Sequence, residues 1–93
     1  MNCLSDQQLR AAMSTVSGWR RQRGQLTRLF EFKDFVDALK FVQRVGRAAE
    51  RFQHHPDIDI RWNKVVLRWV THDAGGLTAR DFEMARRCNR LAG

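Results

Sequence analysis

The sequence is poor in the residues that build most specialised sites. Its 93 residues include two cysteines and one proline, and no apolar run approaches the about 20 residues that a membrane-spanning helix needs. Cys3 and Cys88 stand far apart without a Cys-x-x-Cys pair, so we expect reduced thiols rather than a disulfide framework or a thiolate metal site. The first residues lack the basic and apolar segments of a secretory signal, and we expect a cytoplasmic protein without a membrane partner.

Several catalytic motifs are also absent. None of the three serines stands in a nucleophile-elbow sequence. The pair Gly75-Gly76 lacks the spacing and the lysine of a phosphate-binding loop. No His-x-x-x-His pair is present, and the side chains of the adjacent His54 and His55 are expected to diverge, so we predict no metal centre.

Acidic residues are outnumbered, with 10 Asp+Glu against 17 Lys+Arg and a net charge of +7. An excess of basic residues favours binding to nucleic acid, because Lys and Arg side chains that bind its phosphates release the counterions of the nucleic acid. The basic residues are nevertheless spread along the chain, with modest clusters only at 20–23 and 86–90. We therefore favour a solvated basic surface over a nucleic-acid-binding protein.

The composition predicts one folded domain over residues 1–93. A chain of this size buries about 60 to 65% of the surface that it exposes when unfolded, which allows one modest core. Hydrophobic residues make up 43% and aromatic residues 10%, which is too apolar for a disordered chain.

A helix and a hairpin are predicted at the start of the chain. Ser5 and Gln8 have the spacing of a capping box, and the apolar residues after them recur at helical spacing, which predicts a helix over 6–16. Alternating apolar residues then predict strands over 19–22 and 25–32, joined by a two-residue turn that contains glycine.

The longest element is a helix predicted over 34–53. Pro56 closes it, because the residue before a proline is excluded from the helical region. The stripe of apolar residues along this helix is wider than packing against the protein's own sheet requires. A partner subunit is therefore expected, in a homodimer or a homotetramer.

A second hairpin and a last helix follow. Strands are predicted over 58–62 and 65–71 around a turn at Asn63-Lys64, which makes Trp62 a residue of the sheet core. A capping arrangement predicts a helix over 78–92. The order α-β-β-α-β-β-α has no parallel crossover, so we predict an α+β fold in which a four-stranded antiparallel sheet carries three helices on one face.

The three histidines are the chemical centre of the sequence. An imidazole has an ordinary pKa of about 6.5, so near neutral pH it can both give and accept a proton. Taken alone, His54-His55-Pro56 also fits a helix end at which an imidazole caps the last carbonyls. Two carboxylates have two open interpretations: Glu50 orients an imidazole or is a solvated helix residue, and Asp81 holds a histidine or caps the last helix.

The intervals between these residues resemble those of the pterin-4a-carbinolamine dehydratase family. The pattern combines Glu50, His54-His55-Pro56, Trp62, His72 and Asp81. Further matching segments are Gly18-Trp19, Phe30-x-Phe32-x-x-Phe35, Trp62-Asn63-Lys64-Val65, Thr71-His72 and Gly76-Leu77-Thr78. The resemblance extends over most of the chain and implies the same fold that the order of elements predicts.

The resemblance also implies an activity. Family enzymes are hydro-lyases that dehydrate 4a-hydroxytetrahydropterin, such as 4a-hydroxytetrahydrobiopterin, to quinonoid dihydropterin and water. Their substrate is left when aromatic amino acid hydroxylases use tetrahydropterin, so the reaction supports tetrahydropterin recycling. No cofactor other than the pterin substrate and no metal are implied.

The same resemblance assigns the residues of the site. It implies that His54 and His72 are the acid/base pair and that His55 completes the catalytic set, mainly by binding the pterin. The implied pterin site consists of the three histidines with Pro56, Thr71, Asp73 and Ala74, and the implied supporting residues are Glu50, Trp62 and Asp81. This sequence has Ala74 where relatives carry a cysteine, so the resemblance implies no thiol role there.

Family members also act as dimerisation partners of transcription factors, and related proteins assist enzyme assembly. A non-catalytic dimerisation, assembly or coactivator module is therefore the alternative function. Such a scaffold does not require all three histidines, so their presence favours catalysis.

Overall fold

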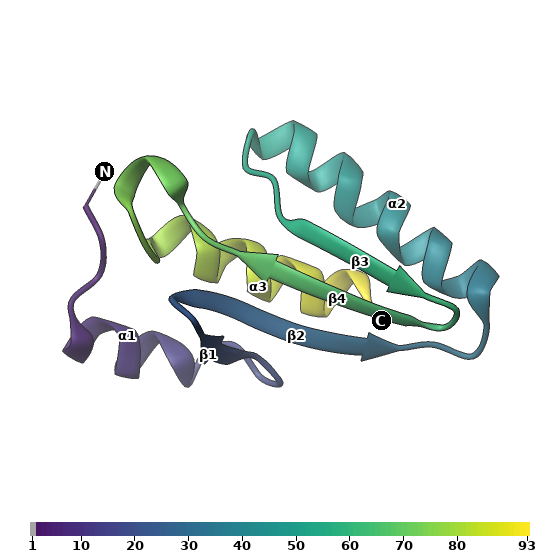
Figure 1. Cartoon of the computed structure of the whole chain (residues 1–93), viewed down its shortest axis with the longest axis horizontal. Coiled ribbons are helices and arrows are strands. Elements are labelled where there is room, and N and C mark those ends of the chain that lie inside the picture. Colours follow the sequence, from purple (N-terminus) through teal and green to yellow (C-terminus); the bar gives the residue numbers. More distant parts are fainter. Residues whose placement is uncertain (1) are drawn as a thin grey trace.

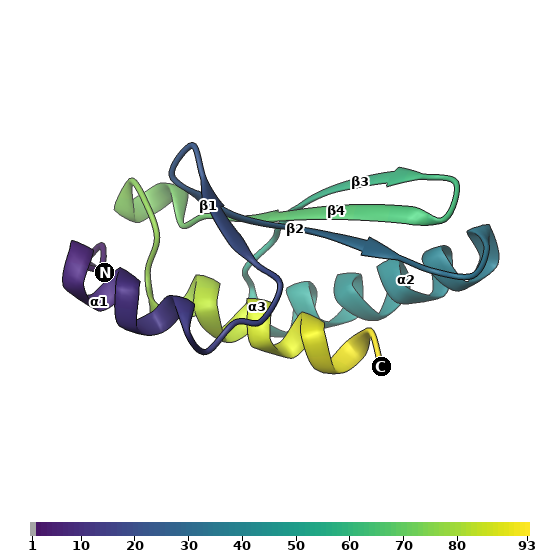
Figure 2. The ribbon, with the colours of Figure 1, turned by 90° about the horizontal axis from the view of Figure 1, so that it is seen from below.

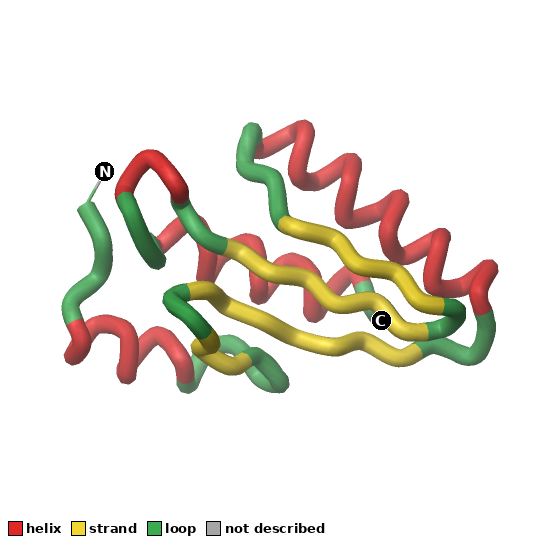
Figure 3. Tube along the Cα trace, viewed as in Figure 1, coloured by secondary structure: helices red, strands yellow, loops and turns green. Residues whose placement is uncertain are grey.

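The computed structural model describes residues 2–93 and contains the predicted elements in the predicted order (Figure 1). The elements are α1 (Asp6–Met13), β1 (Arg20–Gln22), β2 (Gln25–Glu31), α2 (Phe35–Phe52), β3 (Asp57–Arg61), β4 (Lys64–Trp69), the short 3₁₀ helix η1 (His72–Ala74) and α3 (Ala79–Leu91). The strands form one antiparallel sheet in the order β1-β2-β4-β3 (Figure 3). The helices lie on one side of this sheet and leave its other face uncovered (Figure 2). The predicted α+β fold is confirmed.

Local signals set the starts of the helices. The Ser5 hydroxyl accepts a hydrogen bond from the Gln8 amide and the Gln8 side chain accepts one from the Ser5 amide, so the predicted capping box is present. α1 ends at Met13, earlier than the predicted residue 16. The hydroxyls of Ser14 and Thr15 bond to carbonyls of the preceding turn, and such side-chain bonds compete with further helix.

α2 ends where the sequence predicts. Gln53 follows it with a left-handed backbone, φ 52°, and Pro56 prevents further helix. The helix packs one face into the core through Ala38, Phe41, Val45 and Ala49. Large apolar side chains near its start remain exposed: Phe35, Val36 and Leu39.

The turn between β3 and β4 differs from its prediction by one residue. Arg61 pairs with Lys64, so the turn consists of Trp62 and Asn63. Trp62 has φ 52° and is 66% exposed, and the prediction that it lies in the sheet core is wrong. The cause is Asn63. Its buried side-chain amide donates to the backbone carbonyl of Phe32 over 2.8 Å, and its backbone carbonyl accepts from the backbone amide of Phe32. These bonds to the end of β2 fix the turn at Trp62-Asn63.

The core lies between the sheet and the two long helices. Aromatic rings form its centre, with Phe30 and Phe41 centroids 4.7 Å apart and Trp69 fully buried. Cys88 of α3 is buried in the same layer, and this burial raises the pKa of its thiol to about 12 against a smaller opposing effect of the neighbouring Trp69. A thiol held in its neutral form is a poor nucleophile, which makes Cys88 a packing residue. Within residues 2–93, no helix has the length and apolar character needed to cross a membrane.

Candidate active site

His54 and His55 lie in the junction between α2 and β3, and a long-range contact fixes this junction. Arg80, near the start of α3, donates to the carbonyls of Phe52 and Gln53 over 3.1 and 2.9 Å. The last carbonyls of a helix lack partners within the helix and attract cations. One guanidinium therefore ties the end of α2 to the start of α3. The sequence contains no local signal for this contact, because its partners are far apart in the chain.

A buried carboxylate holds the first histidine. Asp81 is fully buried, and its Oδ1 lies 2.6 Å from Nε2 of His54. Its Oδ2 accepts hydrogen bonds from the Thr71 hydroxyl over 2.8 Å and from the Thr78 amide over 2.9 Å. Asp81 thus caps α3 and holds a histidine at once, so both interpretations of this residue apply.

The Asp81 network also determines the tautomer of His54. An ionised carboxylate only accepts hydrogen bonds, so Nε2 of His54 carries the proton in that contact. Its other ring nitrogen, Nδ1, has no hydrogen-bond partner in the protein within residues 2–93. The ring stacks on Trp69 with centroids 5.4 Å apart, which fixes its plane. His54 is a fixed imidazole with one nitrogen available for proton transfer.

The other two histidines are exposed. His55 contacts the carboxylate of Glu50, one turn earlier on α2, through its Nε2. His72 begins η1, directly after Thr71, and its side chain makes no hydrogen bond within residues 2–93. Its imidazole is free to bond to a ligand.

All three histidines line one shallow hollow of about 220 Å³. The lining residues are Gln53, His54, His55, Val70, Thr71, His72, Asp73 and Arg80. Five of the seven residues expected at the pterin site are among them, whereas Pro56 and Ala74 lie beside the hollow in sequence but do not line it. Trp62 does not line it either, because the turn that carries it lies at the other end of the hairpin (Figure 1).

The chemistry that this hollow offers is proton transfer. Three imidazoles and the carboxylate of Asp73 face a space open to solvent, and one imidazole is held by a buried carboxylate. Within residues 2–93, no group of three or more His, Cys, Asp or Glu side chains is arranged to hold a metal ion. An α+β domain with such a site has the features of a histidine-based acid/base enzyme.

Comparison with known proteins gives the family. The family described as "Pterin 4 alpha carbinolamine dehydratase" matches residues 2–91. The chain belongs to this family and is an enzyme of the lyase class.

Curated relatives match along the whole chain. A relative from Mycobacterium avium is 45% identical over 93 residues, which make up 100% of this chain and 99% of the relative. One from Acidobacterium capsulatum is 49% identical over 88 residues, 95% of this chain and 96% of the relative. Both carry the provisional name pterin-4-alpha-carbinolamine dehydratase.

Solved structures share the fold. A "transcriptional coactivator/pterin dehydratase" from Brucella melitensis superposes with a TM-score of 0.95 at 34% identity, covering 99% of this chain and 100% of that one. A pterin dehydratase-like protein described as a RuBisCO assembly factor in the alpha-carboxysome gives 0.72 at 22% identity, with 85% and 94% covered. At that identity the second likeness shows the fold alone.

Proposed function

We propose that the protein dehydrates a 4a-hydroxytetrahydropterin, such as 4a-hydroxytetrahydrobiopterin, to quinonoid dihydropterin and water, and so supports tetrahydropterin recycling. The observation that carries the proposal is the hollow lined by three imidazoles, one of which is fixed by the buried Asp81. The provisional names of the full-length relatives support the same reaction.

The reaction requires two proton transfers at neighbouring atoms. Carbon C4a carries the hydroxyl group and is bonded to the ring nitrogen N5, which carries a hydrogen. An acid protonates the hydroxyl oxygen, the C4a–O bond breaks, and water leaves while the N5 electron pair forms a C4a=N5 double bond. A base then takes the N5 proton, which gives the quinonoid product. Imidazole suits both tasks, because its ordinary pKa lies near neutral pH.

His54 and His72 have different surroundings, as a base and an acid of one reaction require. Asp81 holds the proton of His54 on Nε2, which leaves Nδ1 to accept the N5 proton. The Asp81 carboxylate also stabilises the imidazolium that results, as the aspartate of a catalytic triad does. His72 is exposed and unbonded, and in its protonated form it can donate to the leaving hydroxyl. We assign His54 as the base and His72 as the acid.

The remaining side chains suit binding of the pterin ring. A pterin presents adjacent N–H groups on its pyrimidine ring, and a carboxylate accepts two parallel hydrogen bonds from such groups. Asp73 lines the hollow and offers that carboxylate. His55, oriented by Glu50, offers a further donor at the rim. Pro56 and Ala74 act through the backbone of the segments that hold these side chains.

The direct test is turnover of a synthetic 4a-hydroxytetrahydropterin. We expect the wild-type protein to accelerate its loss above the buffer rate, with formation of quinonoid dihydropterin, both followed by absorbance. A folded protein that leaves the rate at the buffer value would contradict the proposal. That result would favour the alternative, a non-catalytic dimerisation, assembly or coactivator module on this fold.

We further propose that the protein forms a homodimer or homotetramer through the exposed start of α2. Phe35, Val36 and Leu39 are 45, 56 and 39% exposed, and neighbouring apolar side chains of this kind mark interaction surfaces. Leu39→Asp should lower the mass in light scattering after gel filtration to that of a monomer. Gln7→Asp, an equally acidic change at an exposed position of α1, is the control. A wild-type protein that runs as a monomer would rule the interface out.

A further inference from the structure

Part of the positive charge of the sequence gathers at one groove of the folded protein. α2 and α3 lie side by side on the same face of the sheet (Figure 2), and a groove of about 350 Å³ lies between them. Four of its seven lining residues are arginines, and no aspartate or glutamate of residues 2–93 lines it. The arginines are Arg44, Arg47 and Arg51 of α2 and Arg87 of α3. Because these two segments are distant in the sequence, only the fold brings their charges together.

Two of the four arginines of this α2–α3 groove share one aromatic ring. The guanidinium carbon of Arg87 lies 4.2 Å from the ring centroid of Phe52, and that of Arg51 lies 5.4 Å from it. Arg44 donates through Nε to the Leu91 carbonyl over 3.1 Å, which ties it to the end of α3. The fold therefore holds three guanidinium groups beside one groove before any partner binds.

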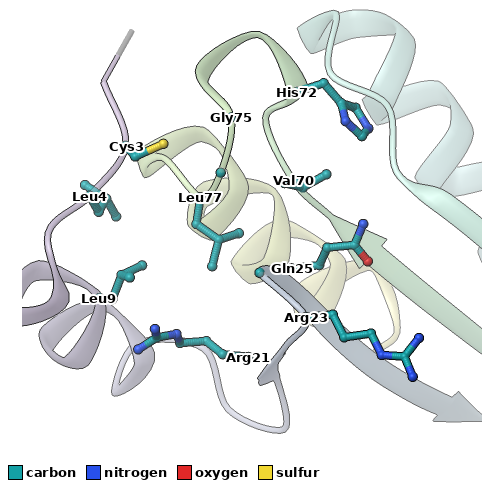
Figure 4. A pocket seen from close by; sticks show the side chains of 12 residues that line it. Cys3, Leu4, Leu9, Arg21, Arg23, Gln25, Val70, His72, Gly75 and Leu77 are labelled. Carbon is teal, nitrogen blue, oxygen red and sulfur yellow. The ribbon is translucent and has the colours of Figure 1, made fainter.

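The largest hollow of the molecule lacks such a convergence of charge. It has a volume of about 780 Å³ and lies between the segment that leads into α1, the loop around η1 and the β1–β2 hairpin (Figure 4). Arg21 and Arg23 line it, but their side chains point in opposite directions (Figure 4). The smaller α2–α3 groove is therefore the better surface for an anionic partner.

Most of the charge at the α2–α3 groove is not neutralised within the protein. Arg47 and Arg51 are exposed and form no ion pair within residues 2–93, whereas Arg87 pairs with Glu83 over 3.7 Å. Like charges held close together repel one another, and an anionic partner relieves this repulsion. A second copy of the chain would bring the same arginines to a symmetric contact, so the groove does not suit self-association.

The remaining lining of the groove is apolar and consists of Ala48, Phe52 and Leu91. Such a floor packs against apolar side chains, which the sugar-phosphate backbone of a nucleic acid does not carry. Arg44, Arg47 and Arg51 recur at helical spacing and so line about two turns of α2. Carboxylates that recur at the same spacing on a partner helix would face them. The lining therefore favours an acidic protein segment over a nucleic acid.

We propose that the α2–α3 groove docks an acidic amphipathic segment of a partner protein, whose carboxylates pair with Arg47 and Arg51 and whose apolar side chains lie over Phe52. A helix laid into a groove is a common mode of peptide recognition. Guanidinium groups pair with carboxylates through two parallel charge-assisted hydrogen bonds, which fixes the register of the segment. No residue lines both this groove and the histidine hollow, so the docking site is independent of the proposed reaction.

The test uses a fluorescein-labelled peptide of three Glu-Leu-Leu-Glu repeats, whose binding is measured by fluorescence anisotropy. The salt concentration is about 0.15 M, at which exposed charges more than about 8 Å apart are screened. We expect Arg47→Gln/Arg51→Gln to weaken binding about tenfold, as the loss of two surface ion pairs would. Arg20→Gln/Arg21→Gln removes the same charge from exposed positions of β1 outside the groove and should change the affinity less than about twofold. Thermal unfolding should be unchanged in both variants.

Two further probes define the chemistry of the partner. A peptide with serine in place of each leucine keeps the carboxylates but loses the apolar contacts, and it should bind about tenfold more weakly or worse. A fluorescein-labelled oligodeoxythymidylate presents phosphates instead, and it should bind more weakly than the Glu-Leu-Leu-Glu peptide.

Several results would overturn the docking site. Wild-type protein that does not bind the Glu-Leu-Leu-Glu peptide, or an affinity that survives in Arg47→Gln/Arg51→Gln, would remove it. Equal losses in the two double variants would assign binding to net charge rather than to the groove. Equal binding of the serine peptide would contradict the role of the apolar floor. Tighter binding of the oligodeoxythymidylate would make the groove a nucleic-acid surface instead.

Discussion

His72→Gln is expected to lower kcat/KM for dehydration by about 100-fold or more, the usual contribution of one general acid or base. The variant should remain as stable as the wild type, because His72 is exposed and its side chain makes no hydrogen bond within residues 2–93. Turnover of the synthetic substrate and thermal unfolding measure the two effects. Gln43→Ala, an exposed change on α2 away from the hollow, is the control and should alter neither.

The pH profile separates a catalytic His72 from a binding one. An acid must be protonated, so wild-type kcat/KM should fall at alkaline pH, and His72→Gln should lose that alkaline limb. His54→Gln should lose the acidic limb instead, because a base must be deprotonated. A His72→Gln variant that keeps both limbs and changes only KM would contradict the assignment.

Asp81→Ala is expected to destabilise the fold by about 3 kcal/mol, because it breaks a buried, hydrogen-bonded pair. Without the carboxylate, the His54 Nε2–H, the Thr71 hydroxyl and the Thr78 amide lose their acceptor. Urea unfolding measures the change in the free energy of unfolding. Asp59→Ala, which removes a carboxylate paired with Arg61 at the surface, should cost at most about 0.5 kcal/mol.

Asp81→Asn separates the effect on stability from the effect on catalysis. The amide keeps the shape of the side chain but places a donor where one of the three donors needs an acceptor. We expect a smaller loss of stability and a loss of kcat of about 100-fold, because the tautomer of His54 is no longer fixed. If the Asp81→Ala and Asp59→Ala proteins had equal free energies of unfolding, the buried network would contribute nothing to stability.

Much of the fold follows from local signals. The two capping boxes, the turn at Arg23-Gly24 and the stop at Pro56 each depend on neighbouring residues, and the structure contains all of them. The β3–β4 turn could not be placed in this way. Its position depends on the bonds from Asn63 to Phe32, two residues that are distant in the chain.

The candidate site also has features that the sequence predicts and features that it does not. The resemblance to the family singled out the three histidines, and they line one hollow. The clamp of Arg80 on the end of α2 and the meeting of Thr71 and Thr78 on Asp81 are long-range hydrogen bonds. Hydrogen bonds of this kind produce no hydrophobic period, so sequence patterns do not reveal them.

The Arg80 clamp has a consequence for the kinetics of binding. Since it joins the end of α2 to the start of α3, the segments that carry His54 and Asp81 are held together before any ligand arrives. A preorganised site pays little conformational entropy on association. We therefore expect ligand capture without a slow closing step, at a rate that depends on diffusion and on the charge of the ligand.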